Sequence, residues 1–218
     1  MNSQCSAIVI ALFFSIFAAT AQATTIRPPN VVLIVVDDLG WADLGCYGST
    51  YYETPNLDRL AAGGVRFTQA YASCAVCSPT RASIMTGRYP TRTGVTDWIR
   101  PLLGNDIIEQ DVRDAPAYVG DHNRMLLTPR VVRWMERGEM TIAELLNNAG
   151  YVTGFIGKWH LGPTSWFPED QGYEFNVGGC SFGQPPHYFD PYPAKHQPMS
   201  LPNLPPRVEG EYLTDREA

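Results

Sequence analysis

The segment that most constrains the fold of this chain is an unbroken apolar run of strand length, Asn30 to Val36. The run does not alternate between apolar and polar residues, so we expect a central strand of a parallel sheet, covered on both faces. It ends at Asp37 and Asp38. Because ligands bind at the carboxyl ends of strands in open α/β sheets, these two carboxylates are candidate functional groups.

The segments that follow alternate between helical and strand patterns. Helical spacing over Asn56 to Ala62 stops at a glycine pair, and a short strand is expected at Val65 to Phe67. A capping box opens a second helical pattern at Thr141, and Tyr151 to Ile156 then predicts another strand. This order indicates an α/β fold.

A further helix is predicted after Cys77. Ser78 followed by Pro79 is typical of an N-cap with proline at the first helical position, and Gly87 ends the helix. Cys77 is therefore expected just before a helix N-terminus.

The strand ending at Ile156 leads into Gly157-Lys158-Trp159-His160. If the chain stays extended there, Lys158 and His160 point to the same side, because strand side chains alternate with period two. We therefore expect a cation and an imidazole to face one site.

The N-terminus resembles a secretion signal. Ala7 to Ala19 is apolar except for Ser15, too short for a membrane span, and Ala21-Gln22-Ala23 fits a cleavage site. No Lys or Arg precedes the run, and a buried helix is the alternative. We interpret residues 1–23 as a signal peptide, and expect a periplasmic or secreted protein without a stable membrane anchor.

Composition narrows the functional classes. The 218-residue chain is 44% hydrophobic and 17% charged, as in ordinary globular proteins, and its formal net charge is −6. A protein without a basic excess has no general means of neutralising phosphates, so nucleic acid is not an expected partner.

The segment Cys77-Ser78-Pro79-Thr80-Arg81, followed after four residues by Thr86-Gly87, resembles the sulfatase modification motif at every fixed position. The segment from Gly150 to His160 is similar to the second sulfatase signature, which ends in G-K-W-H. With Asp37-Asp38-Leu39-Gly40-Trp41, three motifs occur in the order of that family. The resemblance implies an alkaline-phosphatase-like α/β fold, whose largely parallel sheet is flanked by helices on both faces and is incomplete in this chain.

The resemblance also implies the site residues. Asp37, Asp38 and the modified Cys77 would ligate one divalent cation, usually Ca²⁺, with Mg²⁺ left open. Arg81 would hold the nucleophile, and Ser181 is a candidate for a further sulfate contact. Lys158 would bind the sulfate oxygens, and His160 the hydroxyl whose deprotonation completes the reaction.

The implied activity is hydrolysis of sulfate esters. In sulfatases the cysteine is oxidised to formylglycine by a formylglycine-generating enzyme, which would be a partner of Cys77 during maturation. The substrate would be a sulfated small molecule or a sulfated glycan. Aromatic residues in the later loops favour a carbohydrate, namely Trp166, Phe167, Tyr188, Phe189 and Tyr192.

Parts of the same pattern also fit other interpretations. Paired aspartates after a strand are often caps or turn residues, and Cys74-Ala75-Val76-Cys77 also has the spacing of a redox pair or half a zinc site. A phosphoester hydrolase of the same superfamily and a non-catalytic binding protein are the alternative functions.

The resemblance implies that further metal ligands and the proton donor for the leaving group follow residue 218. We therefore interpret residues 24–218 as the N-terminal part of a catalytic domain and expect this part alone to be inactive. Disulfide pairing among Cys46, Cys74 and Cys180 is left open.

Overall fold

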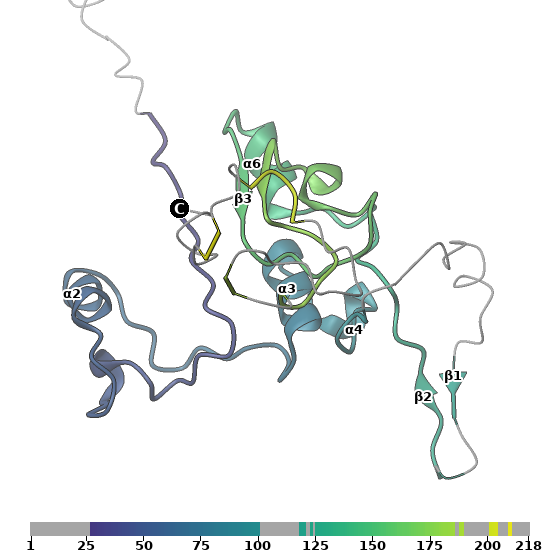
Figure 1. Ribbon diagram of the computed structural model, residues 1–218, viewed down its shortest axis with the longest axis horizontal. Helices are drawn as coiled ribbons and strands as arrows, with labels where there is room; N and C mark the ends of the chain where they lie inside the picture. Colours follow the sequence, from purple (N-terminus) through teal and green to yellow (C-terminus); the bar gives the residue numbers. More distant parts are fainter. Residues whose placement is uncertain are drawn as a thin grey trace, which may run out of the picture. The chain divides into compact units, whose positions relative to one another are not determined.

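The computed structural model describes residues 27–100, 118–120, 123, 125–185, 188–189, 201–204 and 209–210 (Figure 1). The predicted signal peptide lies outside these residues. None of the helices in the described ranges has the length and apolar character that a bilayer crossing requires. The chain divides into two compact units, Met1–Glu53 and Thr54–Ala218.

The described part of the first unit contains one short 3-10 helix, η1 (Gly45–Tyr47), which ends at Gly48 in the left-handed conformation. The predicted central strand at Asn30 to Val36 is not formed. The side chains from Val31 to Val36 are between 41% and 83% exposed. A strand is defined by hydrogen bonds to a neighbour, and no described segment pairs with this run.

Among the described residues, the second unit contains the longer helices. These are α2 (Pro55–Gly63), α3 (Cys77–Thr86), α4 (Pro90–Thr93) and α6 (Ile142–Asn148), with the 3-10 helix η2 (Pro168–Gln171). The helices predicted over 56–62 and after Thr141 are confirmed. At α6 the Thr141 hydroxyl accepts from the Glu144 amide at 3.2 Å, and the Glu144 carboxylate accepts from the Thr141 amide at 2.7 Å. Local capping therefore defines the start of this helix, as the sequence predicts.

Two small sheets lie in the described part of the second unit. β3 (Gly154–Ile156) pairs in parallel with β4 (Phe175–Val177), and β1 (Tyr118–Val119) pairs antiparallel with β2 (Thr128–Pro129). The predicted strand ending at Ile156 is thus confirmed over its last three residues. The strand predicted at Val65 to Phe67 is wrong, since these residues belong to none of the described strands and all three are exposed.

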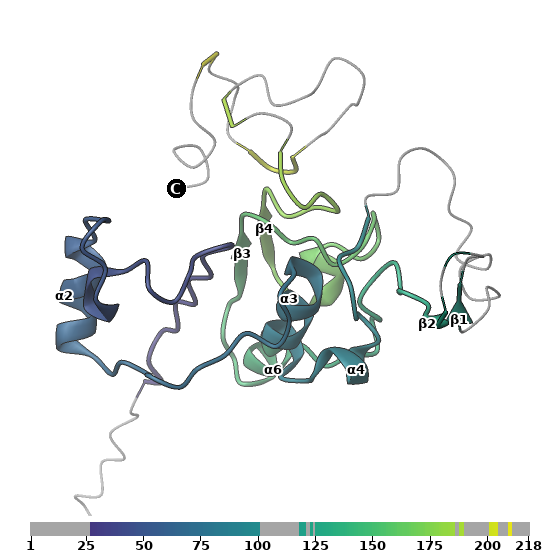
Figure 2. The same ribbon diagram turned by 90° about the horizontal axis from the view of Figure 1, so that it is seen from below.

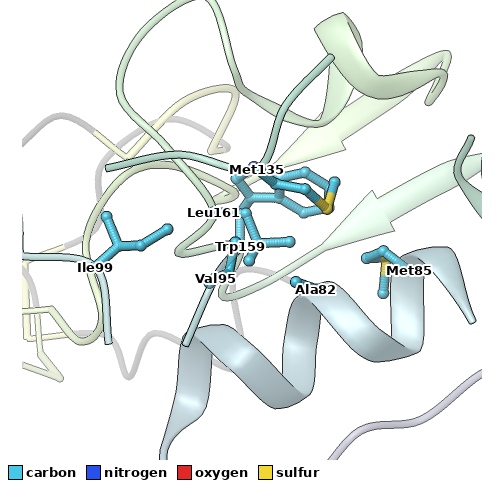
Figure 3. Close-up of a cluster of buried hydrophobic side chains, with 7 residues drawn as sticks. All are labelled: Ala82, Met85, Val95, Ile99, Met135, Trp159 and Leu161. Carbon is cyan, nitrogen blue, oxygen red and sulfur yellow. The ribbon is translucent and has the colours of Figure 1, made fainter. Parts of the chain in front are cut away.

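The core of the second unit lies between α3 and the segment that follows β3 (Figures 2 and 3). Ala82 and Met85 of α3 face Trp159 and Leu161, and Trp159 is 1% exposed. Phe155 contacts Trp159 edge to face at 5.0 Å between ring centroids. The remaining core residues are Val95, Ile99 and Met135. This packing holds α3 against the G-K-W-H segment.

Candidate functional site

Cys77 is the first residue of α3, a ten-residue helix that ends at Gly87 in the left-handed conformation, as predicted. The predicted N-cap is wrong, because Val76 rather than Ser78 has the extended conformation of a cap residue. Ser78 is completely buried, and its hydroxyl bonds to other segments. Cys77 itself is partly exposed at the start of the helix.

The loop before Cys77 is held by Thr80. The Thr80 hydroxyl donates to the carbonyl of Cys74 at 2.9 Å and accepts from the Cys74 amide at 3.1 Å. A single side chain thereby satisfies both backbone groups of Cys74 and fixes the approach to Cys77. The fourth residue of the motif thus has a structural role.

Arg81 connects α3 to the second signature. Its guanidinium donates to the backbone carbonyl of Lys158, and both residues are partly buried. The structure therefore brings together Arg81 and Lys158, which the sequence predicts to share a site. The contact that is observed runs through the Lys158 backbone.

His160 lies in the interior rather than at the end of an extended strand. β3 ends at Ile156, and the backbone of His160 is left-handed with φ of 61°. The alternation expected for Lys158 and His160 is therefore wrong, because it required an extended chain. His160 is 1% exposed, and its amide donates to the carbonyl of Cys180 at 3.0 Å.

The ring of His160 is held by groups that the sequence analysis missed. Its Nε2 lies 2.6 Å from the carbonyl oxygen of Ile99, and a Cβ built on Gly183 would lie 2.6 Å from its Cε1. Nothing in the local sequence marks Ile99, since its contribution is a backbone carbonyl. Gly183 is required by this close approach, because any side chain there would displace the ring.

Ser181 follows Cys180, so the Cys180 carbonyl that binds the His160 amide brings Ser181 into the same neighbourhood. Ser181 is partly exposed. Its role as a sulfate contact stays a prediction.

Asp37 and Asp38 lie at a turn of the first unit, and both are exposed. Asp38 has φ of 58°, a left-handed conformation that aspartate tolerates better than most residues. The carboxylate of Asp43 accepts from the nearby amide of Gly40 at 2.7 Å, which stabilises the segment after Asp38.

The predicted metal ligands Asp37, Asp38 and Cys77 come from both units, and the structure describes each unit by itself. Within the described residues no group of three or more His, Cys, Asp or Glu side chains is arranged to hold a metal ion. Two consecutive exposed carboxylates have the donor chemistry of a hard cation, but they supply only part of its usual six to eight ligands.

The described cysteines form no disulfide; these are Cys46, Cys74, Cys77 and Cys180. Trp166, one of the aromatic residues expected to contact a sugar, is only 8% exposed and stacks on Trp134 at 4.8 Å between ring centroids. Its role is thus in packing. Tyr188 and Phe189 are exposed at 51% and 58%.

Comparison with known proteins identifies the family. The sulfatase family model matches residues 29–216. Human arylsulfatase A is 40% identical over 166 residues, which are 75% of this chain and 27% of that protein. Human N-acetylgalactosamine-6-sulfatase is 38% identical over 174 residues, which are 79% of this chain and 28% of that protein.

The fold is also similar to a solved structure, that of Ps i-CgsB in complex with k-i-k-neocarrahexaose. The TM-score is 0.53 at 33% identity, with 70% of this chain and 29% of that chain covered. The chain spans less than a third of the length of each of these relatives. These matches confirm the predicted fold class and the resemblance drawn from the motifs. The chain belongs to the sulfatase family.

Proposed function

We propose that this chain is the part of a sulfate ester hydrolase that contains the nucleophile, and that Cys77 is the residue converted to formylglycine. The observation that carries the proposal is the packing of α3 against the G-K-W-H segment. The residue after Cys77 bonds to His160, and Arg81, four residues after Cys77, bonds to Lys158. Residues from both signatures therefore meet at the start of one helix.

The start of α3 suits an anionic substrate. The first amides of a helix have no partners within the helix, and the helix dipole favours negative charge there. Arg81 adds a fixed positive charge one turn into the helix, and Lys158 lies on the segment that Arg81 binds. A sulfate ester repels nucleophiles because it is an anion, so positive groups around the reacting atom lower the barrier.

The chemistry needs a hydroxyl nucleophile, because a thiol would be left as a stable adduct with the transferred group. Formylglycine supplies a hydrated aldehyde, whose second hydroxyl allows sulfate to be expelled after transfer. In this proposal Lys158 neutralises the sulfate oxygens, Arg81 orients residue 77, and His160 accepts a proton from the hydroxyl at that position.

Asp37 and Asp38 would hold the divalent cation through carboxylate oxygens, which suit a hard ion. We propose Ca²⁺ because it is the usual cation of sulfatases, and the same donors also suit Mg²⁺. The cation supplies electrostatic activation of a bound hydroxyl. Both side chains are exposed, so a cation can reach their carboxylate oxygens.

We propose a sulfated carbohydrate as the substrate. Two relatives support this class of substrate. One is named N-acetylgalactosamine-6-sulfatase, and the other was solved in complex with k-i-k-neocarrahexaose. Exposed Tyr188 and Phe189 are of the type that stacks on sugar faces. Export remains part of the proposal, based on the apolar segment Ala7 to Ala19.

The test begins with the modification. The full-length protein is co-expressed with a formylglycine-generating enzyme, and the tryptic peptide from Phe67 to Arg81 is examined by mass spectrometry. We expect the aldehyde at Cys77 and an unmodified Cys74. Cys74→Ser is the matched control, because it leaves the motif intact, whereas Cys77→Ser removes the thiol that is oxidised.

Activity is then measured in parallel on an aryl sulfate, an aryl phosphate and defined sulfated oligosaccharides. We expect turnover of sulfate esters that Cys77→Ser abolishes and Cys74→Ser retains. Modification at Cys74, or preferential hydrolysis of the aryl phosphate, would contradict the proposal.

A further inference from the structure

Three segments of the second unit are joined by a closed circuit of hydrogen bonds centred on Ser78. The Ser78 hydroxyl donates to the carbonyl of His160 at 3.0 Å and accepts from the amide of Ile99 at 3.0 Å. The carbonyl of Ile99 in turn lies 2.6 Å from His160 Nε2. Ser78, Ile99 and His160 are 0%, 2% and 1% exposed, so water does not compete for these bonds.

The circuit determines which nitrogen of His160 carries hydrogen. A backbone carbonyl can only accept, so His160 Nε2 must be the donor in its contact with Ile99. In the neutral ring Nδ1 is then the acceptor nitrogen. Any proton that the neutral imidazole takes up must therefore arrive at Nδ1.

The backbone of His160 also needs support from its surroundings. A left-handed conformation is uncommon for residues other than glycine, although histidine adopts it more readily than most, and neighbouring groups stabilise it. Here the carbonyl of His160 is fixed by Ser78 and its amide by Cys180. The close approach of Gly183 limits rotation of the ring.

We infer that Ser78 is a positioning residue for His160. It acts directly on the His160 carbonyl and, through the backbone of Ile99, on the His160 ring. Because Ser78 directly follows Cys77, the same helical turn sets the position of the nucleophile and the orientation of the imidazole. This inference rests on the proposed function for its catalytic consequence, but the hydrogen-bond circuit and the tautomer can be tested without it.

The first measurement needs no substrate. In full-length protein labelled with ¹⁵N at histidine, long-range ¹H–¹⁵N spectra distinguish a ring protonated at Nε2 from one protonated at Nδ1, and the His160→Asn spectrum assigns the signal. Asparagine is chosen because it tolerates the left-handed backbone. We expect His160 to be protonated at Nε2. A ring protonated only at Nδ1 would overturn the inference, whether or not any variant folds.

The second measurement compares Ser78→Ala with Ser78→Thr, which keeps the hydroxyl. Ser83→Ala is the matched control, since Ser83 lies on the same helix and its buried hydroxyl has no hydrogen-bond partner among the described residues. Turnover of an aryl sulfate is normalised to the aldehyde content at residue 77, and melting temperature is recorded for each variant.

For Ser78→Ala we expect kcat to fall by roughly tenfold with KM within about twofold, and the Nε2 signal of His160 to broaden or shift. Ser78→Thr should recover kcat to within about threefold of the parent, and Ser83→Ala should match the parent. An unchanged kcat and unchanged His160 signal in folded Ser78→Ala would overturn the inference. A parent that carries the aldehyde but hydrolyses no sulfate ester would instead contradict the proposed function, and the ring signals would still decide the role of Ser78.

Discussion

The two compact units differ in what holds their backbones in place. In the first unit the described contacts are local, as in the bond between Asp43 and Gly40 and the left-handed cap at Gly48. In the second unit, residues far apart in sequence are joined by buried bonds, such as Ser78 to His160. Both units carry motif residues. A recognisable sequence motif therefore does not predict how the surrounding chain is held in place.

The two units also differ in how far their apolar segments are buried. The run from Val31 to Val36 is as apolar as any core segment, yet each side chain is exposed by 41% or more, whereas Leu161 is fully buried. Hydrophobic character provides a driving force for burial, but it does not specify the partner. In the second unit one apolar cluster finds partners within the described chain, whereas other apolar side chains, such as Val65 and Phe67, are exposed.

The largest expected effect tests whether the first unit contributes residues to the chemistry. Asp37→Asn combined with Asp38→Asn should lower sulfate ester hydrolysis on the order of a thousandfold, because both proposed cation ligands are weakened. The free energy of unfolding should change by less than about 0.5 kcal/mol, since both side chains are exposed.

Asp43→Asn is the matched control for that pair, since the amide oxygen can still accept from Gly40. It should retain activity within about threefold. Calorimetric titration with Ca²⁺ gives the independent readout, and unchanged affinity in the double variant would remove both aspartates from the cation site.

The second expected effect concerns packing. Leu161→Ala should lower the free energy of unfolding by about 2–5 kcal/mol, because it leaves a cavity in a fully buried position. Val32→Ala, at a side chain that is 83% exposed, should cost under about 0.5 kcal/mol. Urea denaturation of both variants measures the difference. Equal destabilisation would mean that the apolar run is buried in the protein in solution.

A smaller effect is expected at the start of α6. Thr141→Ala removes the hydroxyl that caps the helix and also donates to the carbonyl of Gln171 at 2.8 Å. We expect a loss of about 1–2 kcal/mol, measured by thermal unfolding. Thr141→Ser keeps the hydroxyl and should recover most of the stability; a Ser variant as unstable as the Ala variant would show that the methyl group matters instead.

The smallest effect is a dependence of stability on pH. Burial raises the pKa of Tyr173 from 10.0 to about 12, so the folded state favours the neutral phenol. The stabilisation is present below pH 10 and is lost as pH rises from 10 toward 12, because the unfolded chain releases this proton first.

Relative to Tyr173→Phe, the parent should therefore lose stability between pH 8 and pH 11, by under about 1 kcal/mol given the partial exposure of the ring. Melting temperatures of the two proteins at both pH values provide the measurement. Parallel curves would show that Tyr173 does not titrate differently in the two states.

Sequence reasoning succeeded where the determinants are local. The capping box at Thr141 and the glycine that ends α3 depend on residues within one or two turns, and both are confirmed. The strand at Asn30 to Val36 failed because pairing partners are not encoded in the run itself. The N-cap at Ser78 failed because tertiary bonds to Ile99 and His160 take its hydroxyl.

The candidate site shows the same difference between features set by local sequence and features set by contacts with distant segments. Motif spacing named Cys77, Arg81, Lys158 and His160, and the structure joins α3 to the G-K-W-H segment. The supporting groups are mostly backbone atoms, such as the carbonyls of Ile99 and Cys180, and any amino acid could supply them. A pattern of side chains cannot reveal contacts of this kind.

If Cys77 is modified as proposed, the burial of Pro79 limits when the modification can take place. Pro79 is among the fully buried side chains, and Arg81 is engaged with the Lys158 carbonyl. A modifying enzyme that selects Cys77 through these two neighbours can reach them only while α3 is unpacked or locally unfolded. The yield of modified protein would then depend on two rates, the rate at which Cys77 is oxidised and the rate at which α3 packs onto its core. A variant that folds faster could leave more molecules with an unmodified thiol.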